Sequence, residues 1–125
     1  MRRVTTKVLL ATGLLGLAAI GNGPAALAAA HDGNWSVLVI TEKGDCDQAY
    51  RYSVAVLDGH LKYTGDASVN MAGTVAPTGA VNVSIKLGDN GANGTGKLSG
   101  NAGVGTWHGA AANSTCAGRW EAEKR

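Results

Sequence analysis

The chain of 125 residues has room for one domain and contains 19 glycines and no phenylalanine. Its formal charge of +2 depends on Arg2, Arg3 and Lys7, because the remaining 8 basic residues are set against 9 acidic ones. The chain beyond this basic start therefore carries a charge near −1. Nucleic-acid binding is disfavoured, because no basic patch is present to neutralise phosphates.

The N-terminal segment has the order of a secretory signal peptide. A basic start precedes an apolar run from Val8 to Ile20, and small residues follow a Gly-Pro break. Cleavage after Ala28 or after Ala30 fits the small-x-small rule, so residues 1–30 are predicted to be the signal peptide. The apolar run is shorter than the roughly 20 residues of a membrane span, so no membrane span is expected. The sequence predicts export, to the periplasm or out of the cell.

The chain has two cysteines, Cys46 and Cys116. An exported chain meets an oxidising compartment, so the pair predicts a disulfide. Closing a loop of about 70 residues would stabilise the domain by roughly 4 kcal/mol on the chain-entropy relation. Two free thiols or a metal pair are the alternatives, although two sulfurs without a nearby histidine make a poor zinc site.

Residues 31–125 are predicted to form the folded domain, and they begin with short β-type runs. The run Asn34–Thr41 is apolar on both faces, so either both faces are covered or one meets a partner. Residues 49–57 alternate with a period of two, as a half-buried strand does. Asp58-Gly59 is a strong hairpin signal before the returning run Leu61–Tyr63.

Four more strands are predicted after this hairpin. Ser68–Val75 and Val81–Leu87 both alternate, and the second is the clearest half-buried strand in the chain. Ala92–Ser99 and Gly103–Gly109 carry glycine at alternate positions, which predicts a strongly coiled sheet. We expect Trp107 to fill the space that these glycines leave.

The last predicted strand, Thr115–Glu123, carries Cys116 and Trp120 on one face. Eight short strands with tight connections predict an all-β fold, a small antiparallel up-and-down barrel. In that topology the start of the last strand lies beside the end of the first, close to Cys46. The same pairing predicts that the rings of Trp35 and Trp120 lie near each other.

No residue pattern in the chain is typical of catalysis. It contains no Gly-x-Ser-x-Gly nucleophile elbow, and His60 and His108 are expected to be solvated. Asp45 and Asp47 flank Cys46 and are interpreted as turn residues. The sequence therefore predicts a protein that is not an enzyme and has no cofactor.

A speculative metal site depends on His31. If cleavage follows Ala28, the chain begins Ala29-Ala30-His31. A free amine, two backbone amides and an imidazole at the third position can bind Cu(II) or Ni(II) in a square plane. The alternative is a histidine in a frayed terminus.

Five aromatic residues are candidate ligand contacts. Barrel mouths are common sites for small molecules, and rings can line them. The alternative is that the same rings belong to the core. These residues are Trp35, Trp107, Trp120, Tyr50 and Tyr52.

Four segments resemble a group of small exported proteins of rhizobia-like bacteria. They are Asp32–Val37, Thr41–Asp47, Gly105–Trp107 and Cys116–Arg125. The resemblance covers essentially the whole chain after the signal and implies an exported, disulfide-bridged β protein, but it carries over no functional residue. In shape, the expected barrel is similar to avidin-like, lipocalin-like and bacterial protease-inhibitor barrels, by fold-level analogy alone.

These observations lead to one functional hypothesis and two alternatives. The first is an exported, monomeric, non-catalytic barrel that binds an unknown small molecule. The second is a module that binds a protein, as a periplasmic protease inhibitor or an adhesion module does. The third is a structural role in the cell envelope.

Overall fold

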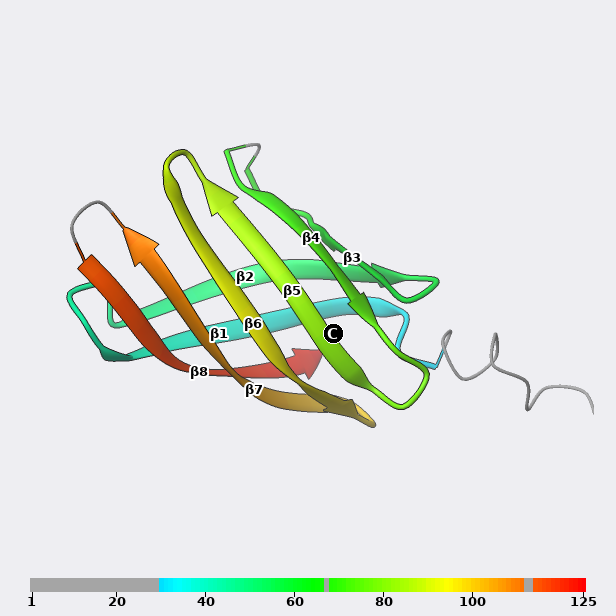
Figure 1. Cartoon of the computed structure of the whole chain (residues 1–125). Coiled ribbons are helices and arrows are strands. Elements are labelled where there is room, and N and C mark those ends of the chain that lie inside the picture. The colour runs from blue at the N-terminus through cyan, green and yellow to red at the C-terminus, as the bar shows by residue number, and fades with distance from the viewer. Residues whose placement is uncertain (1–29, 67, 112–113) are drawn as a thin grey trace, which may run out of the picture.

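The computed structural model describes residues 30–66, 68–111 and 114–125. In these residues it shows a closed barrel of eight antiparallel strands in chain order, which confirms the predicted fold class (Figure 1). The strands are β1 Gly33–Lys43, β2 Ala49–Leu57, β3 His60–Tyr63, β4 Asn70–Val75, β5 Ala80–Leu87, β6 Asn90–Ser99, β7 Ala102–Ala111 and β8 Ser114–Lys124.

The predicted signal peptide falls almost wholly on residues 1–29, which lie outside the described residues, as does the proposed cleavage bond after Ala28. In the part of the chain that the structure describes, no helix is long and apolar enough to cross a membrane.

Pairing between β1 and β8 closes the barrel. The register runs from Trp35 opposite Lys124, through Val39 opposite Trp120, to Thr41 opposite Gly118, and a bulge follows Thr41. The prediction that the last strand lies beside the first is therefore confirmed. This pairing joins the first and last strands of the sheet, as closure of a barrel requires.

The seam between β3 and β4 is the shortest in the barrel. Only two residue pairs join these strands, His60 with Thr74 and Leu61 with Gly73. The predicted strand at Ser68–Val75 begins later than expected, at Asn70. The hairpin before this seam is as predicted, since Asp58 and Gly59 both have positive φ values, 52° and 78°.

The strands alternate between an apolar inner face and a more polar outer face. On β8, Cys116, Gly118, Trp120 and Ala122 are buried, whereas the charged residues between them are exposed. The outer face of β1 is the exception, because Leu38 and Ile40 are apolar and only half-buried. This alternation is the physical reason that a period of two in the sequence predicted the fold.

The end of the barrel where β1 begins is closed, and we call it the closed end. Its core is a cluster of buried side chains, of which Trp35 is 2% exposed and Trp120 is 7% exposed. The two predicted neighbours thus belong to one cluster. The cluster comprises Trp35, Val56, Val75, Val81, Leu98, Trp120 and Ala122.

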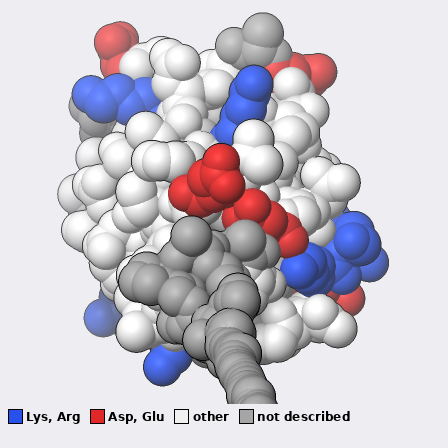
Figure 2. Space-filling model, turned by 90° about the vertical axis from the view of Figure 1, so that its right-hand side faces the viewer, with Lys and Arg blue, Asp and Glu red and all other residues white. Residues whose placement is uncertain are grey.

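The residues that precede β1 pack against the closed end. His31 is buried, with its Nε2 3.3 Å from the Pro77 carbonyl oxygen, and its own carbonyl accepts a hydrogen bond of 2.9 Å from the Trp35 indole. The Asp32 carboxylate accepts from the Asp58 amide at 3.0 Å. Figure 2 views this end, with acidic side chains near the middle of the face and basic ones around it.

The alternate glycines of β6 and β7 make room for Trp120. A Cβ atom at Gly96 or Gly105 would clash with the Trp120 ring, and one at Gly103 would lie 3.4 Å from it. The prediction that Trp107 fills this space was wrong. The register explains why, because Gly105 pairs directly with Trp120 on β8.

Candidate ligand-binding cavity

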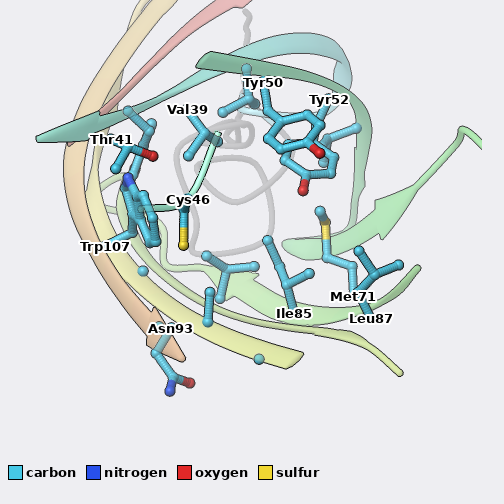
Figure 3. A pocket seen from close by; sticks show the side chains of 18 of the residues that line it. Val39, Thr41, Cys46, Tyr50, Tyr52, Met71, Ile85, Leu87, Asn93 and Trp107 are labelled. Atoms are coloured by element: carbon cyan, nitrogen blue, oxygen red, sulfur yellow. The ribbon is translucent and has the colours of Figure 1, made fainter. Parts of the chain in front are cut away.

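The end of the barrel opposite the closed end contains a cavity of about 380 Å³, and we call this the open end. The cavity is bounded below by Trp35 and Trp120 and reaches the rim, where Tyr50 is 49% exposed and Leu87 is 39% exposed. The inner positions of successive strands supply much of its lining, and those labelled in Figure 3 include Val39, Tyr52, Met71, Ile85, Leu87 and Trp107.

Tyr50 and Tyr52 form one wall of the cavity, and Tyr63 packs against this wall. Tyr50 and Tyr52 project from the inner face of β2 with ring centroids 6.0 Å apart, and their rings overlie each other in Figure 3. Tyr63 on β3 packs edge-on against Tyr52, with centroids 5.8 Å apart and planes at 74°. Such contacts between rings restrict their movement, so this wall presents flat apolar surfaces with hydroxyl groups on them.

Trp107 lines the cavity on the side away from the tyrosines (Figure 3). Its indole N–H donates a 3.0 Å hydrogen bond to the Ile40 carbonyl on β1. The residue between them in the sheet is Gly118, which pairs with Trp107 and has no side chain in the way. The bond holds the ring toward β1, where it bounds the cavity.

The loop from Gly44 to Gln48 lies at the rim of the open end. Cys46 and Cys116 form the predicted disulfide, with their Cα atoms 6.2 Å apart. Thr41 fixes the other side of the loop, since its amide donates to the Gln48 carbonyl at 2.9 Å and its hydroxyl to the Asp47 carbonyl at 2.6 Å. Three bonds thus anchor a short loop beside the mouth.

The titration of two tyrosines reflects their places on this wall. A hydrogen bond to the Asp47 carboxylate, together with its negative charge, raises the pKa of Tyr50 above the usual 10.0. Burial, followed by the neighbouring Tyr63, raises the pKa of Tyr52. Both phenols are therefore neutral at physiological pH. The O–H of Tyr50 is engaged by Asp47, whereas that of Tyr52 can donate a hydrogen bond to a ligand.

The structure brings all five predicted aromatic residues to the cavity. Trp35 and Trp120 form its floor and belong to the core, whereas Trp107, Tyr50 and Tyr52 line its upper part. Two of the five rings are therefore core residues, as the alternative interpretation expected, and the other three line the cavity. All three indole N–H groups are bonded to backbone carbonyls, those of His31, Ile40 and Thr95.

The aliphatic lining was missed by the sequence interpretation, which considered aromatic residues alone. Met71, Ile85 and Leu87 point into the cavity from β4 and β5. Their alternation with polar neighbours had placed them on the inner face, so the same pattern that predicted the strands could have identified them. Asn93, also at the boundary, points away from the cavity (Figure 3).

The remaining candidates lie apart from the cavity. His60 and His108 are exposed, as expected, and His31 is buried at the closed end. A Cu(II) or Ni(II) site at His31 would also need Ala29, which lies outside the described residues. Within 30–66, 68–111 and 114–125, no three His, Cys, Asp or Glu side chains are grouped to hold a metal ion.

The described residues thus define a small closed β-barrel with an apolar cavity that opens at one end. Comparison with protein-family models, with curated proteins and with solved structures finds no match.

Proposed function

We propose that this protein is an exported, non-catalytic binding protein whose barrel holds a small apolar or aromatic molecule. The observation that carries the proposal is the cavity of about 380 Å³ at the open end. Pockets for small ligands are usually between about 300 and 1,000 Å³ and are mostly apolar with a few polar groups. A space of this size is also large enough for several waters, which an apolar ligand would displace.

The lining supports binding by burial of apolar surface. Val39, Ile85 and Met71 offer no hydrogen-bonding group apart from their backbone, and the indole N–H of Trp107 is already bonded. Apolar contact stabilises a complex by about 25 cal/mol for each Å² removed from water, before the cost of immobilising the ligand. The hydroxyl of Tyr52, which lines the cavity, can orient a polar end of the ligand.

The alternative of a protein partner has less support from the outer surface. Two of the most exposed large apolar side chains, Leu57 and Val104, are 69% and 63% exposed. They lie on β2 and β7, which are separated in the barrel by β8 and β1. Single exposed apolar residues are common on any protein, and contiguous patches are the usual mark of a protein interface.

A neutral fluorescent probe tests the proposal. N-phenyl-1-naphthylamine brightens in apolar surroundings, so we expect its emission to rise to saturation as the protein is titrated. Replacement of Ile85 by Trp should fill the cavity and lower the affinity at least about tenfold, the effect of roughly 1.4 kcal/mol.

The matched control is Asn82→Trp, because Asn82 is exposed on the outer face of the same strand. This variant adds the same ring outside the cavity, so binding should equal that of the wild type. Equal binding by the wild type and by both variants would place the probe elsewhere and contradict the proposal. The absence of any binding would leave the protein-partner and structural alternatives.

A further inference from the structure

The charged side chains that line the cavity in the described residues are all negative. Of the described residues that line it, only Asp45 and Asp47 are charged, and both belong to the rim loop. The disulfide at Cys46 and the hydrogen bond from Thr41 to the Asp47 carbonyl hold the backbone of this loop in place. The two carboxylates therefore stay near the mouth, where they act on any charged group that approaches.

The basic residues Lys43 on β1 and Lys86 on β5 do not balance these carboxylates from inside the cavity. Lys43 is exposed at the end of β1 and Lys86 is exposed on the outer face of β5, and neither lines the cavity. An anionic ligand would meet two carboxylates at the mouth and no cation in the described lining of the cavity. Both carboxylates are exposed, so their repulsion of an anion acts through water and is strongest at low salt.

The aromatic wall also favours a positively charged ligand. The faces of tyrosine and tryptophan rings carry partial negative charge and attract a cation within about 6 Å of the ring centre. Tyr50, Tyr52 and Trp107 line the cavity together with Asp47. A cation at the rim would therefore be close both to ring faces and to carboxylates.

We propose that the barrel selects an apolar cation, a molecule whose hydrocarbon or aromatic body enters the cavity while its ammonium group stays at the mouth beside Asp45 and Asp47. This inference rests on the proposed function and narrows its ligand class. It excludes long-chain carboxylates and other anionic amphiphiles as preferred ligands.

Three probes with the same alkyl chain separate the charge preference from simple apolar binding. Decyltrimethylammonium, 1-decanol and decanoate would each displace N-phenyl-1-naphthylamine at low salt, below the concentrations at which they aggregate. We expect the ammonium to bind roughly fivefold to tenfold more tightly than the alcohol, because its charge can pair with the exposed carboxylates and contact the aromatic rings. Decanoate should bind more weakly than the alcohol, and salt should reduce both differences.

Paired variants test whether the rim carboxylates are the cause. The double variant Asp45→Asn with Asp47→Asn should reduce the ammonium preference to about twofold and leave decanol binding unchanged. Asp58→Asn is the control, because it removes one negative charge at the closed end, and asparagine tolerates the positive φ of 52° there.

Each pattern of results has one meaning. A preference for the ammonium that the double variant loses and Asp58→Asn keeps supports the inference. Equal binding of the three probes, or tightest binding of decanoate, overturns the inference and leaves the proposed function standing. A preference that survives in the double variant overturns the role of these carboxylates. Failure of all three probes to bind overturns the proposed function as well.

Discussion

The closed half and the open half of this barrel are built from the same strands with the same alternation, yet one is filled and the other is hollow. In the closed half, Trp120 lies over glycines at positions 96, 103 and 105, so one large ring occupies the space of several side chains. In the open half, Trp107 is bonded to Ile40 on the wall, and the aliphatic side chains facing it leave a cavity.

The difference shows that large rings do not by themselves fill a small barrel. A ring fills the interior where the positions around it are glycine, and it becomes part of a lining where it is bonded to the wall. Stability should therefore depend mainly on the closed half, and binding on the open half.

Replacement of Trp120 by Ala should lower the free energy of unfolding by about 4–5 kcal/mol, because the glycines around it cannot close the space left behind. Trp107→Ala should cost only about 1–2 kcal/mol, since this ring is half-buried and loses one hydrogen bond. Urea denaturation followed by far-ultraviolet circular dichroism measures both. Equal losses would contradict the division of roles between the halves.

Removal of the disulfide should lower the free energy of unfolding by about 4 kcal/mol, because the bridge closes a loop across 70 positions of sequence separation. The double variant Cys46→Ser with Cys116→Ser tests this by urea denaturation, and reductant should lower the thermal midpoint of the wild type. Binding of N-phenyl-1-naphthylamine should also weaken, because the rim loop loses its anchor. A thermal midpoint unchanged by reductant would show that the bridge does not secure the closing strand.

Two glycines give a matched test of packing. Gly105→Ala should cost about 2 kcal/mol, because the new Cβ would clash with the Trp120 ring and the Thr95 carbonyl. Gly91→Ala should change stability by less than about 0.5 kcal/mol, because the nearest atom to its new Cβ is the Ile85 carbonyl oxygen at 3.6 Å. Thermal denaturation ranks the two, and a larger loss for Gly91→Ala would reverse the comparison.

The smallest expected effect concerns Tyr50 at the rim. Asp47→Asn weakens the hydrogen bond and removes the negative charge that together raise the pKa of Tyr50, so that pKa should fall toward 10.0. Because the folded-state pKa is the raised one, this pair contributes stability below about pH 10, and that contribution is lost as pH rises through the raised value. Ultraviolet absorbance of the phenolate measures the change. The pKa of Tyr52, raised first by burial, should remain high in this variant.

The sequence predicted the strand order, the closure and the disulfide, because each depends on alternation and spacing along the chain. It did not predict which tryptophan lies over the glycines, since Trp107 and Trp120 both face inward and only the register decides between them. The alternating pattern also could not predict that the open half contains a cavity. An alternating strand shows which side chains face inward, and the volume they leave depends on how rings such as Trp107 are turned and bonded.

The most direct test of the account is a crystal structure of the protein grown with N-phenyl-1-naphthylamine. We predict that the probe lies inside the open half, between Tyr52, Ile85 and Trp107, with Trp120 unmoved beneath it. Electron density for the probe on the outer surface, or an open half filled by the protein's own side chains, would contradict the claim that this barrel holds a small molecule.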